Sequence, residues 1–205
     1  MAVTIGIDEA GRGPIAGPVS VGVIAYEEGF DLLGAFPGLN DSKQLSEKKR
    51  EVLFGILEEH VAAGNVQYRV ELSSSQMIDE KGIVPAVNAA LERGLKSLLP
   101  KPFDTDGNET GKVWLDGALR APSEYLQETV IGGDGLIPAI MLASVAAKVV
   151  RDRMMVQEIA TRFPDYSFEK HKGYGTAAHY AAIKEHGLCD EHRRSFLKSY
   201  LASSK

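Results

Sequence analysis

The sequence predicts an α/β domain in which helices cover one central β-sheet. The chain has 205 residues, of which 44% are hydrophobic and 25% are charged, and this fits one globular domain with a sizeable core. Short β-rich runs are spread along the chain, and helical runs fill most of the intervals between them. This mixture of strands and helices indicates one sheet with helices packed on it, in an α/β or an α+β arrangement.

The β-rich runs give five expected strands. Each is short, contains β-branched residues and is bounded by residues typical of turns. The expected ranges are 3–8, 18–25, 66–72, 112–116 and 128–131. The second run alternates in hydrophobicity as a half-buried strand does.

Helical patterns and one loop account for most of the chain between the second and fourth expected strands. Ser46 is expected to cap a helix that ends near Val61, because a serine side chain accepts a hydrogen bond from a first-turn N–H. Pro85 is expected to interrupt a helical region over 75–99. The stretch 100–111 is rich in Pro, Gly and Asp, so a surface loop is expected there.

A longer helix is expected after Pro138, and a last one over 176–186, ended by Gly187. The spacing in the longer helix predicts an apolar stripe made of Val145, Val149, Val156, Ile159 and Phe163. The polar residues expected outside this stripe are Ser144, Lys148, Arg151 and Asp152.

Composition and charge limit the classes of protein that fit. The longest apolar run, 137–147, is far shorter than the roughly 20 residues of a membrane helix, so no membrane association is expected. The single cysteine, Cys189, cannot form an internal disulfide, which favours a reducing compartment, the cytoplasm. The net charge of −5 argues mildly against a nucleic-acid partner. Basic residues cluster locally, however, at 42–50, 147–153, 169–175 and 191–198.

Acidic residues stand at the ends of several expected strands. Asp8 and Glu9 end one, Asp116 ends another immediately before Gly117, and Asp134 follows a third. Neighbouring strand ends in an open α/β sheet meet at the edge where ligands bind, so these carboxylates are expected to lie close together. Any one of them alone would be typical of a cap or a turn. As a set they repel by about 4 kcal/mol per pair at about 4 Å and an effective dielectric of about 20, unless a cation neutralises them. Oxygen-only ligands favour Mg²⁺ or Mn²⁺.

Several motifs occur together in a fixed order. The chain contains DEAGRGP followed by GPV, then DSKQLS, a strand-end DG, a GD before IPAI, ASVAAKVVRDRMM, KGYGT and HRRSF. In these motifs, from Ile5 to about Phe196, the sequence resembles the ribonuclease HII family, the type 2 ribonucleases H. The resemblance implies a single ribonuclease H-like domain over 1–205, with a five-stranded mixed sheet flanked by helices. Residues from about 165 to 205 would form a C-terminal helical portion that binds substrate.

The resemblance also implies a role for each motif. The family carboxylates that hold the catalytic metals correspond to Asp8, Glu9, Asp116 and Asp134. The motif that recognises the 2′-hydroxyl of a ribonucleotide corresponds to Gly11, Arg12 and Gly13, where a backbone free of side chains can approach a sugar closely. Tyr174 corresponds to a tyrosine that stacks beneath the sugar beside the cleavage site, a core position being the alternative. The candidates for phosphate contact are Ser42, Lys43, Ser144, Lys148 and Lys172.

Other residues are expected to lie outside the chemistry. Asp152, in RDRMM, is expected to be structural or ion-paired, and His171 and His179 are expected at the surface. The chain has Gly-Gly-Asp at 132–134 where the family usually has Lys-Gly-Asp, so a positive charge is missing before Asp134. The chain begins only a few residues before the acid pair, so the N-terminal extension of the type 3 ribonucleases H is not expected.

The activity implied by the resemblance is hydrolysis on the 5′ side of a ribonucleotide, which leaves 5′-phosphate and 3′-hydroxyl ends by a two-metal-ion mechanism with Mg²⁺ or Mn²⁺. The implied substrates are RNA–DNA hybrids and duplex DNA with single embedded ribonucleotides, as met in DNA replication and ribonucleotide excision repair. A monomer is expected, and the sequence indicates no protein partner. Two alternatives stay open. A DNA-directed metal nuclease would not need a 2′-hydroxyl reader, and a non-catalytic binder would have no reason to keep acids that repel phosphates.

Overall fold

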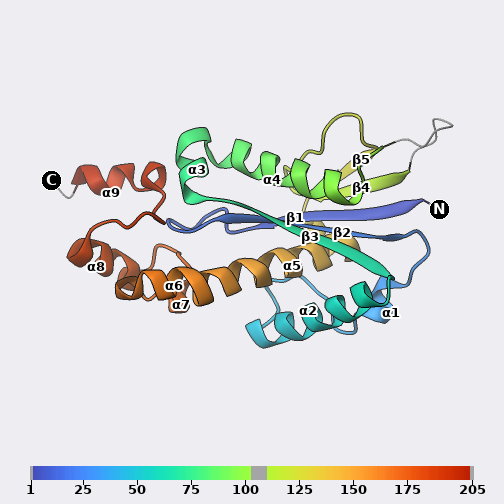
Figure 1. Cartoon of the computed structure of the whole chain (residues 1–205), viewed down its shortest axis with the longest axis horizontal. Helices are drawn as coiled ribbons and strands as arrows, with labels where there is room; N and C mark the ends of the chain where they lie inside the picture. Colours follow the sequence, from blue (N-terminus) through green and yellow to red (C-terminus); the bar gives the residue numbers. More distant parts are fainter. Residues whose placement is uncertain (1, 103–109, 204–205) are drawn as a thin grey trace.

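The structure is a computed structural model that describes residues 2–102 and 110–203. A central sheet lies between two layers of helices, and the C-terminal helices extend beyond one end of it (Figure 1). The strands are β1 (Val3–Ala10), β2 (Val19–Glu27), β3 (Val66–Ser73), β4 (Gly111–Asp116) and β5 (Gln127–Val130). Every expected strand is therefore present, with its ends within two residues of the expected ones.

The sheet is mixed, as predicted. Its strands lie in the order β3-β2-β1-β4-β5. The hairpin partners β1 and β2 are antiparallel, as are β2 and β3, whereas β4 runs parallel to both β1 and β5. The parallel pairing brings the carboxyl ends of β1, β4 and β5 to one edge of the sheet.

Each face of the sheet is covered by its own helices. Helices α3 (Ser75–Lys81) and α4 (Ile83–Leu98) cover one face, where Leu91 and Leu95 pack with Ile5 and Ile7. Helices α1 (Leu32–Ala35), α2 (Glu47–Ala62) and α5 (Pro138–Met154) cover the other (Figure 1). Helix α5 lies very close to β1, since a Cβ at Gly6 would lie 2.2 Å from the backbone of Ala139. The start of α5 is therefore held against the strand that carries the first acids.

The expected helix boundaries are largely confirmed. The Ser46 side chain accepts a hydrogen bond from the N–H of Lys49 at 3.3 Å, which makes it the cap of α2. The helical region over 75–99 is interrupted at Gly82, and Pro85 lies in the first turn of α4, where its missing N–H costs little. Most of the loop expected over 100–111 lies outside the described residues.

The expected apolar stripe of the long helix is partly wrong. Helix α5 continues through a π-helical segment, η2 (Met155–Ile159), into α6 (Ala160–Arg162). This wider turn shifts the side-chain phase, so that Met155 is buried and Val156 is only half-buried. Three polar residues expected outside the stripe are also buried, because other segments cover that side of the helix: the chain after β1 contacts one of them, and Ser42 and Arg50 contact the other two. The three residues are Ser144, Arg151 and Asp152.

The C-terminal segments pack around the end of this helix. They are η3 (Pro164–Tyr166), α7 (Phe168–His171), α8 (Ala177–His186), η4 (Arg194–Phe196) and α9 (Lys198–Ser203). Phe168 and Leu197 form a third apolar cluster with Ile15 and Met155. His179 is fully buried, contrary to expectation, because its two ring nitrogens are engaged by the carbonyl of Tyr174 and by His192. No helix within the described ranges is long and apolar enough to cross a bilayer.

Candidate active site

Three of the predicted acids meet at the edge of the sheet. In the parallel β1–β4 pair Ile7 lies beside Leu115, so the next residues, Asp8 and Asp116, reach the edge together. Asp134 lies in the short segment η1 (Gly133–Gly135) that follows β5, and its N–H donates to Asp116 Oδ1 at 3.3 Å. One carboxylate oxygen from each of these three residues lies within 4.8 Å of the others. The predicted convergence of Asp8, Asp116 and Asp134 is thus confirmed.

Glu9 lies in the same region but outside this group of three. Its Oε1 accepts a hydrogen bond from Arg12 Nη1 at 2.9 Å. Successive residues of a strand point to opposite faces, so Glu9 and Asp8 leave β1 in different directions. The role of Glu9 as a metal ligand stays a prediction.

The charges of the three acids are unequally balanced. Asp8 is 4% exposed, and its pKa is raised well above the ordinary 3.8, first by burial and then by the charges of Glu9 and Asp116. The Ser144 hydroxyl opposes that rise. Asp134, in contrast, has a cation beside it, since Lys43 Nζ lies 2.6 Å from its Oδ2 and has a raised pKa because of this hydrogen bond. A buried set of oxygen donors with excess negative charge fits a divalent cation.

Three of the four predicted acids open onto a cleft of about 390 Å³, and Asp134 is not among its lining residues. The cleft brings together most of the residues predicted to contact substrate, together with Asp8, Glu9 and Asp116. The predicted residues that line it are Gly11, Arg12, Gly13, Ser42, Lys43, Ser144, Lys148 and Tyr174. Lys172 does not line the cleft. Its Nζ donates to the Glu169 carbonyl at 2.6 Å and lies 3.9 Å from Glu47.

The Gly11–Gly13 loop, which follows β1, has two glycines with different surroundings. Gly11 is buried at φ +87°, and a Cβ there would lie 2.0 Å from Arg151 Nε, so only glycine fits. Gly13 is exposed, and a Cβ there would meet no atom within 4 Å. The loop is therefore packed tightly behind Gly11 and is open toward the cleft at Gly13.

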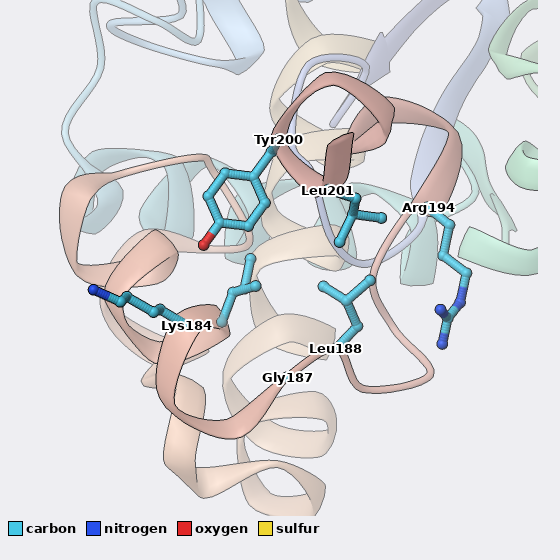
Figure 2. A pocket seen from close by; sticks show the side chains of 7 residues that line it. Lys184, Gly187, Leu188, Arg194, Tyr200 and Leu201 are labelled. Atoms are coloured by element: carbon cyan, nitrogen blue, oxygen red, sulfur yellow. The ribbon is translucent and has the colours of Figure 1, made fainter. Parts of the chain in front are cut away.

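A larger cavity, of about 690 Å³, lies elsewhere in the molecule. It is formed between α8 and α9, with Leu188 and Leu201 pointing into it (Figure 2). Its lining includes Lys184 and Arg194 but no carboxylate. Because Asp8, Glu9, Asp116 and the Gly11–Gly13 loop line the smaller cleft, that cleft is the candidate active site despite its smaller volume.

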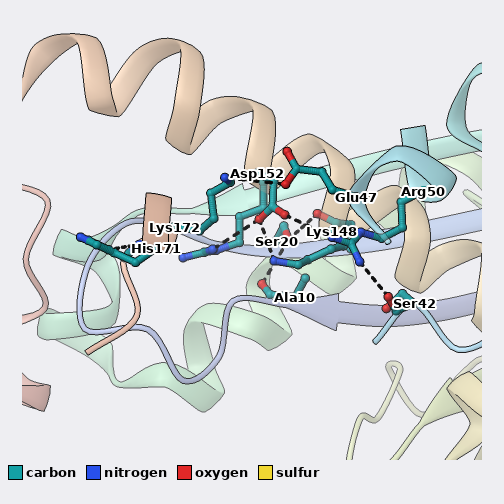
Figure 3. A network of polar contacts seen from close by, with 12 residues as sticks. Ala10, Ser20, Ser42, Glu47, Arg50, Lys148, Asp152, His171 and Lys172 are labelled. Atoms are coloured by element: carbon teal, nitrogen blue, oxygen red, sulfur yellow. Dashed lines mark hydrogen bonds and ion pairs between the residues drawn. The ribbon is translucent and has the colours of Figure 1, made fainter. Parts of the chain in front are cut away.

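A polar network holds the basic residues of the cleft in place (Figure 3). Asp152 accepts a hydrogen bond from Lys148 at 2.8 Å and lies 3.9 Å from Arg50, which confirms that it is ion-paired. Arg50 also donates to the carbonyl of Ser42 at 3.0 Å, and the Ser42 and Ser144 hydroxyls are 2.7 Å apart. These contacts join the segment before α2 to helix α5.

Two residues that line the cleft, Arg50 and Tyr174, differ in how far the sequence predicts them. Arg50 lines the cleft although it is not among the predicted site residues, and the only sequence signal for it is its place in the basic cluster 42–50. Tyr174 is 44% exposed, and Lys148 Nζ lies 5.8 Å from its ring centroid, so the core position is wrong for this tyrosine. Its exposed ring faces the same cleft as the acids.

Fold and site together define a class of protein. A five-stranded mixed sheet with clustered carboxylates at one edge, beside a cleft lined by Lys, Arg and an exposed Tyr, is the arrangement of a metal-dependent hydrolase with a ribonuclease H-like fold.

Comparison with known proteins agrees with this class. The profile of the family described as ribonuclease HII matches residues 5–199. A ribonuclease HII of Endomicrobium trichonymphae is 46% identical over 193 residues, which cover 93% of this chain and 83% of the relative. A ribonuclease HII of Burkholderia mallei is 42% identical over 196 residues, covering 95% and 83%.

Solved structures show the same fold at lower identity. The ribonuclease HII of Archaeoglobus fulgidus, solved in complex with PCNA, has a TM-score of 0.73 and 22% identity, covering 95% of this chain and 94% of that one. Bst-RNase HIII, solved with Mn²⁺, has a TM-score of 0.68 and 16% identity, covering 100% and 70%. The predicted ribonuclease H-like fold is therefore confirmed.

The chain belongs to the ribonuclease HII family. It is accordingly an endoribonuclease, a hydrolase of nucleic acid.

Proposed function

We propose that this enzyme hydrolyses the phosphodiester on the 5′ side of ribonucleotides, in RNA–DNA hybrids and at single ribonucleotides embedded in duplex DNA. The products would carry 5′-phosphate and 3′-hydroxyl ends. One observation supports this most strongly: Asp8, Glu9 and Asp116 line the same cleft as the Gly11–Gly13 loop. A group that cuts phosphodiesters would thus lie next to a backbone that a ribose edge can approach.

The donor set supports Mg²⁺ or Mn²⁺ as the cofactor. Asp8, Asp116 and Asp134 would hold the metal through oxygen atoms only, with Glu9 as a fourth ligand on the cleft wall. Bound in a pair, such ions would supply an activated water and would stabilise the leaving 3′-oxygen. Lys43 places a cation 2.6 Å from Asp134, and burial of Asp8 excludes water from one side of the group.

The remaining cleft residues would bind and orient the duplex. Lys148 and Arg50, both tethered by Asp152, present cations to backbone phosphates. The exposed ring of Tyr174 would stack against a sugar at the cut site. Tyr174 belongs to the portion over 165–205, which we propose to be the substrate-binding part of a single domain.

The test is cleavage of an end-labelled DNA duplex that contains one ribonucleotide. It is run beside an all-DNA duplex and an RNA–DNA hybrid of the same sequence, with Mg²⁺, Mn²⁺ or chelator. The proposal requires a metal-dependent cut 5′ to the ribonucleotide and none in all-DNA. Equal cutting of all three duplexes would instead identify a DNA-directed nuclease, and cutting of none would identify a binding protein.

The variant Arg12→Ala further distinguishes a ribonucleotide-specific enzyme from a DNA-directed nuclease. A ribonucleotide-specific enzyme should lose activity, because Arg12 anchors Glu9 and belongs to the ribose-reading loop. A DNA-directed nuclease should keep it. We also propose a monomer that works in the cytoplasm, in line with the free thiol of Cys189.

A further inference from the structure

A buried arginine of the C-terminal HRRSF motif lies directly behind the Gly11–Gly13 loop. Arg193 is 0% exposed. Its Nη2 donates to the carbonyl of Gly11 at 2.7 Å and its Nη1 to the carbonyl of Arg12 at 3.0 Å. Its Nε donates to the carbonyl of Gly17 at 2.9 Å, and its own N–H donates to Ile15 at 2.8 Å. One side chain thus holds carbonyls at the start and at the end of the connection between β1 and β2.

These hydrogen bonds fix the direction of the loop's peptide groups. In a trans peptide the C=O and the following N–H point in opposite directions. The carbonyls of Gly11 and Arg12 point inward to Arg193, so the N–H groups of Arg12 and Gly13 point the other way, on the side of the loop that lines the cleft. Within the described residues neither N–H donates to another group.

Arg193 cannot act by touching the substrate itself. Its side chain is fully buried, and its guanidinium contacts carbonyls of the loop, not the cleft. The planar guanidinium offers several donors in a fixed arrangement, which lets one residue orient three carbonyls at once. A lysine in its place would keep the charge but not this geometry.

The segment that carries Arg193 is anchored from the other side. The Asp79 carboxylate, on α3, accepts hydrogen bonds from the N–H groups of Arg194 at 2.8 Å and Ser195 at 2.9 Å. Asp79 is only half-buried, so it can be changed without opening the core. Loss of these contacts would loosen the turn that follows Arg193.

We propose that Arg193 is a positioning residue for ribonucleotide specificity, which aims the N–H groups of Arg12 and Gly13 at the ribose. This inference rests on the proposed function, because it assigns those N–H groups to the recognition of a 2′-hydroxyl. A purely structural role would make a different prediction: its loss would weaken binding of all duplexes alike.

The experiment measures binding of two DNA duplexes that differ by one ribonucleotide. It uses the full chain carrying Asp8→Asn, so that binding is observed without cleavage, and fluorescence anisotropy gives both Kd values. Two backbone hydrogen bonds should give this parent a preference of about tenfold for the ribonucleotide duplex. Arg193→Met should reduce the preference to within about twofold of unity while Kd for all-DNA changes little. Arg193→Lys should give an intermediate preference.

Two further variants keep the test decisive. Leu91→Ala shortens a fully buried side chain of α4, in an apolar cluster that contains no residue of the Gly11–Gly13 loop. It should lower the melting temperature without changing the preference for the ribonucleotide duplex. Asp79→Ala should reduce the preference by a smaller factor than Arg193→Met, and it decides the question if the Arg193 variants do not fold.

Each outcome has a definite meaning. A parent without a preference overturns the proposed ribose recognition and the role of Arg193 with it. A parent with the preference, retained in folded Arg193 or Asp79 variants, overturns only the positioning role. Equal weakening of both duplexes also overturns it, since that is the signature of a structural clamp.

Discussion

The sharpest prediction concerns the stability of the metal-free enzyme. Replacing Asp8 with Asn removes one charge from a group whose carboxylate oxygens lie within 4.8 Å of one another. At that distance two ionised carboxylates repel by about 3.5 kcal/mol at an effective dielectric of about 20. Lys43 offsets the charge of Asp134, so Asp116 is the uncompensated partner of Asp8. Because solvent and partial protonation reduce the repulsion, we expect a gain of about 2 kcal/mol, or about 4–8 °C in melting temperature.

The pH dependence follows from the same charge. The pKa of Asp8 is raised in the folded state, so the folded protein keeps a proton that the unfolded chain has lost. Without metal, the contribution of Asp8 to stability should therefore be fully present below the ordinary value of 3.8 and be lost as pH rises through the raised pKa. Asp8→Asn should remove this part of the pH dependence, and Mg²⁺ should raise the melting temperature of the natural protein but not of the variant.

Asp152→Asn is the matched control. Asp152 is 5% exposed, about as buried as Asp8, but it lies 2.8 Å from a cation, Lys148, and not among other acids. Its loss should therefore lower the melting temperature, opposite in sign to Asp8→Asn. The assay is thermal unfolding followed by circular dichroism at pH 8 with chelator. A lower melting temperature for Asp8→Asn would refute the reasoning that the acids form one repelling cluster.

Three other predictions follow from the site and its supports. The pKa values of His179 and His192 are lowered to about 4 by burial, so the unfolded chain takes up protons before the folded protein does as pH falls. The free energy of unfolding should therefore decrease by about 2 kcal/mol per ring between pH 7.5 and 5. Urea titrations of variants with Asn in place of either histidine should show a smaller decrease. Lys43→Ala should change the free energy of unfolding by less than about 1 kcal/mol, because the lysine of its pair with Asp134 is exposed. The same variant should reduce the slope of log K for duplex binding against log salt concentration by about 0.9, and an unchanged slope would exclude a phosphate contact. Tyr174→Ala should lower kcat/KM by about 10–100-fold and Tyr174→Phe by less than about threefold, so equal losses would contradict stacking.

The sequence predicted the elements better than the contacts between them. Strands and strand-end acids have local signals, and the parallel pairing of β1 with β4 then brings Asp8 and Asp116 together. The predicted apolar stripe of the long helix is partly wrong because no local sequence pattern signals the π-helical segment that follows α5. His179 and Arg193 were missed because their partners, a second histidine and three loop carbonyls, come from distant parts of the chain.

The positions of the site residues along the chain have a consequence for biosynthesis. Asp8 is made early, but its neighbours Asp116 and Asp134 follow only after β2, β3 and helices α1 to α4, and Arg193 follows later still. Chains fold as they emerge, N-terminal parts first. A chain that has not yet reached β4 therefore holds Asp8 without the two acids that we propose to hold the metal with it. We therefore expect nuclease activity only after Asp134 has been synthesised and all three acids can meet.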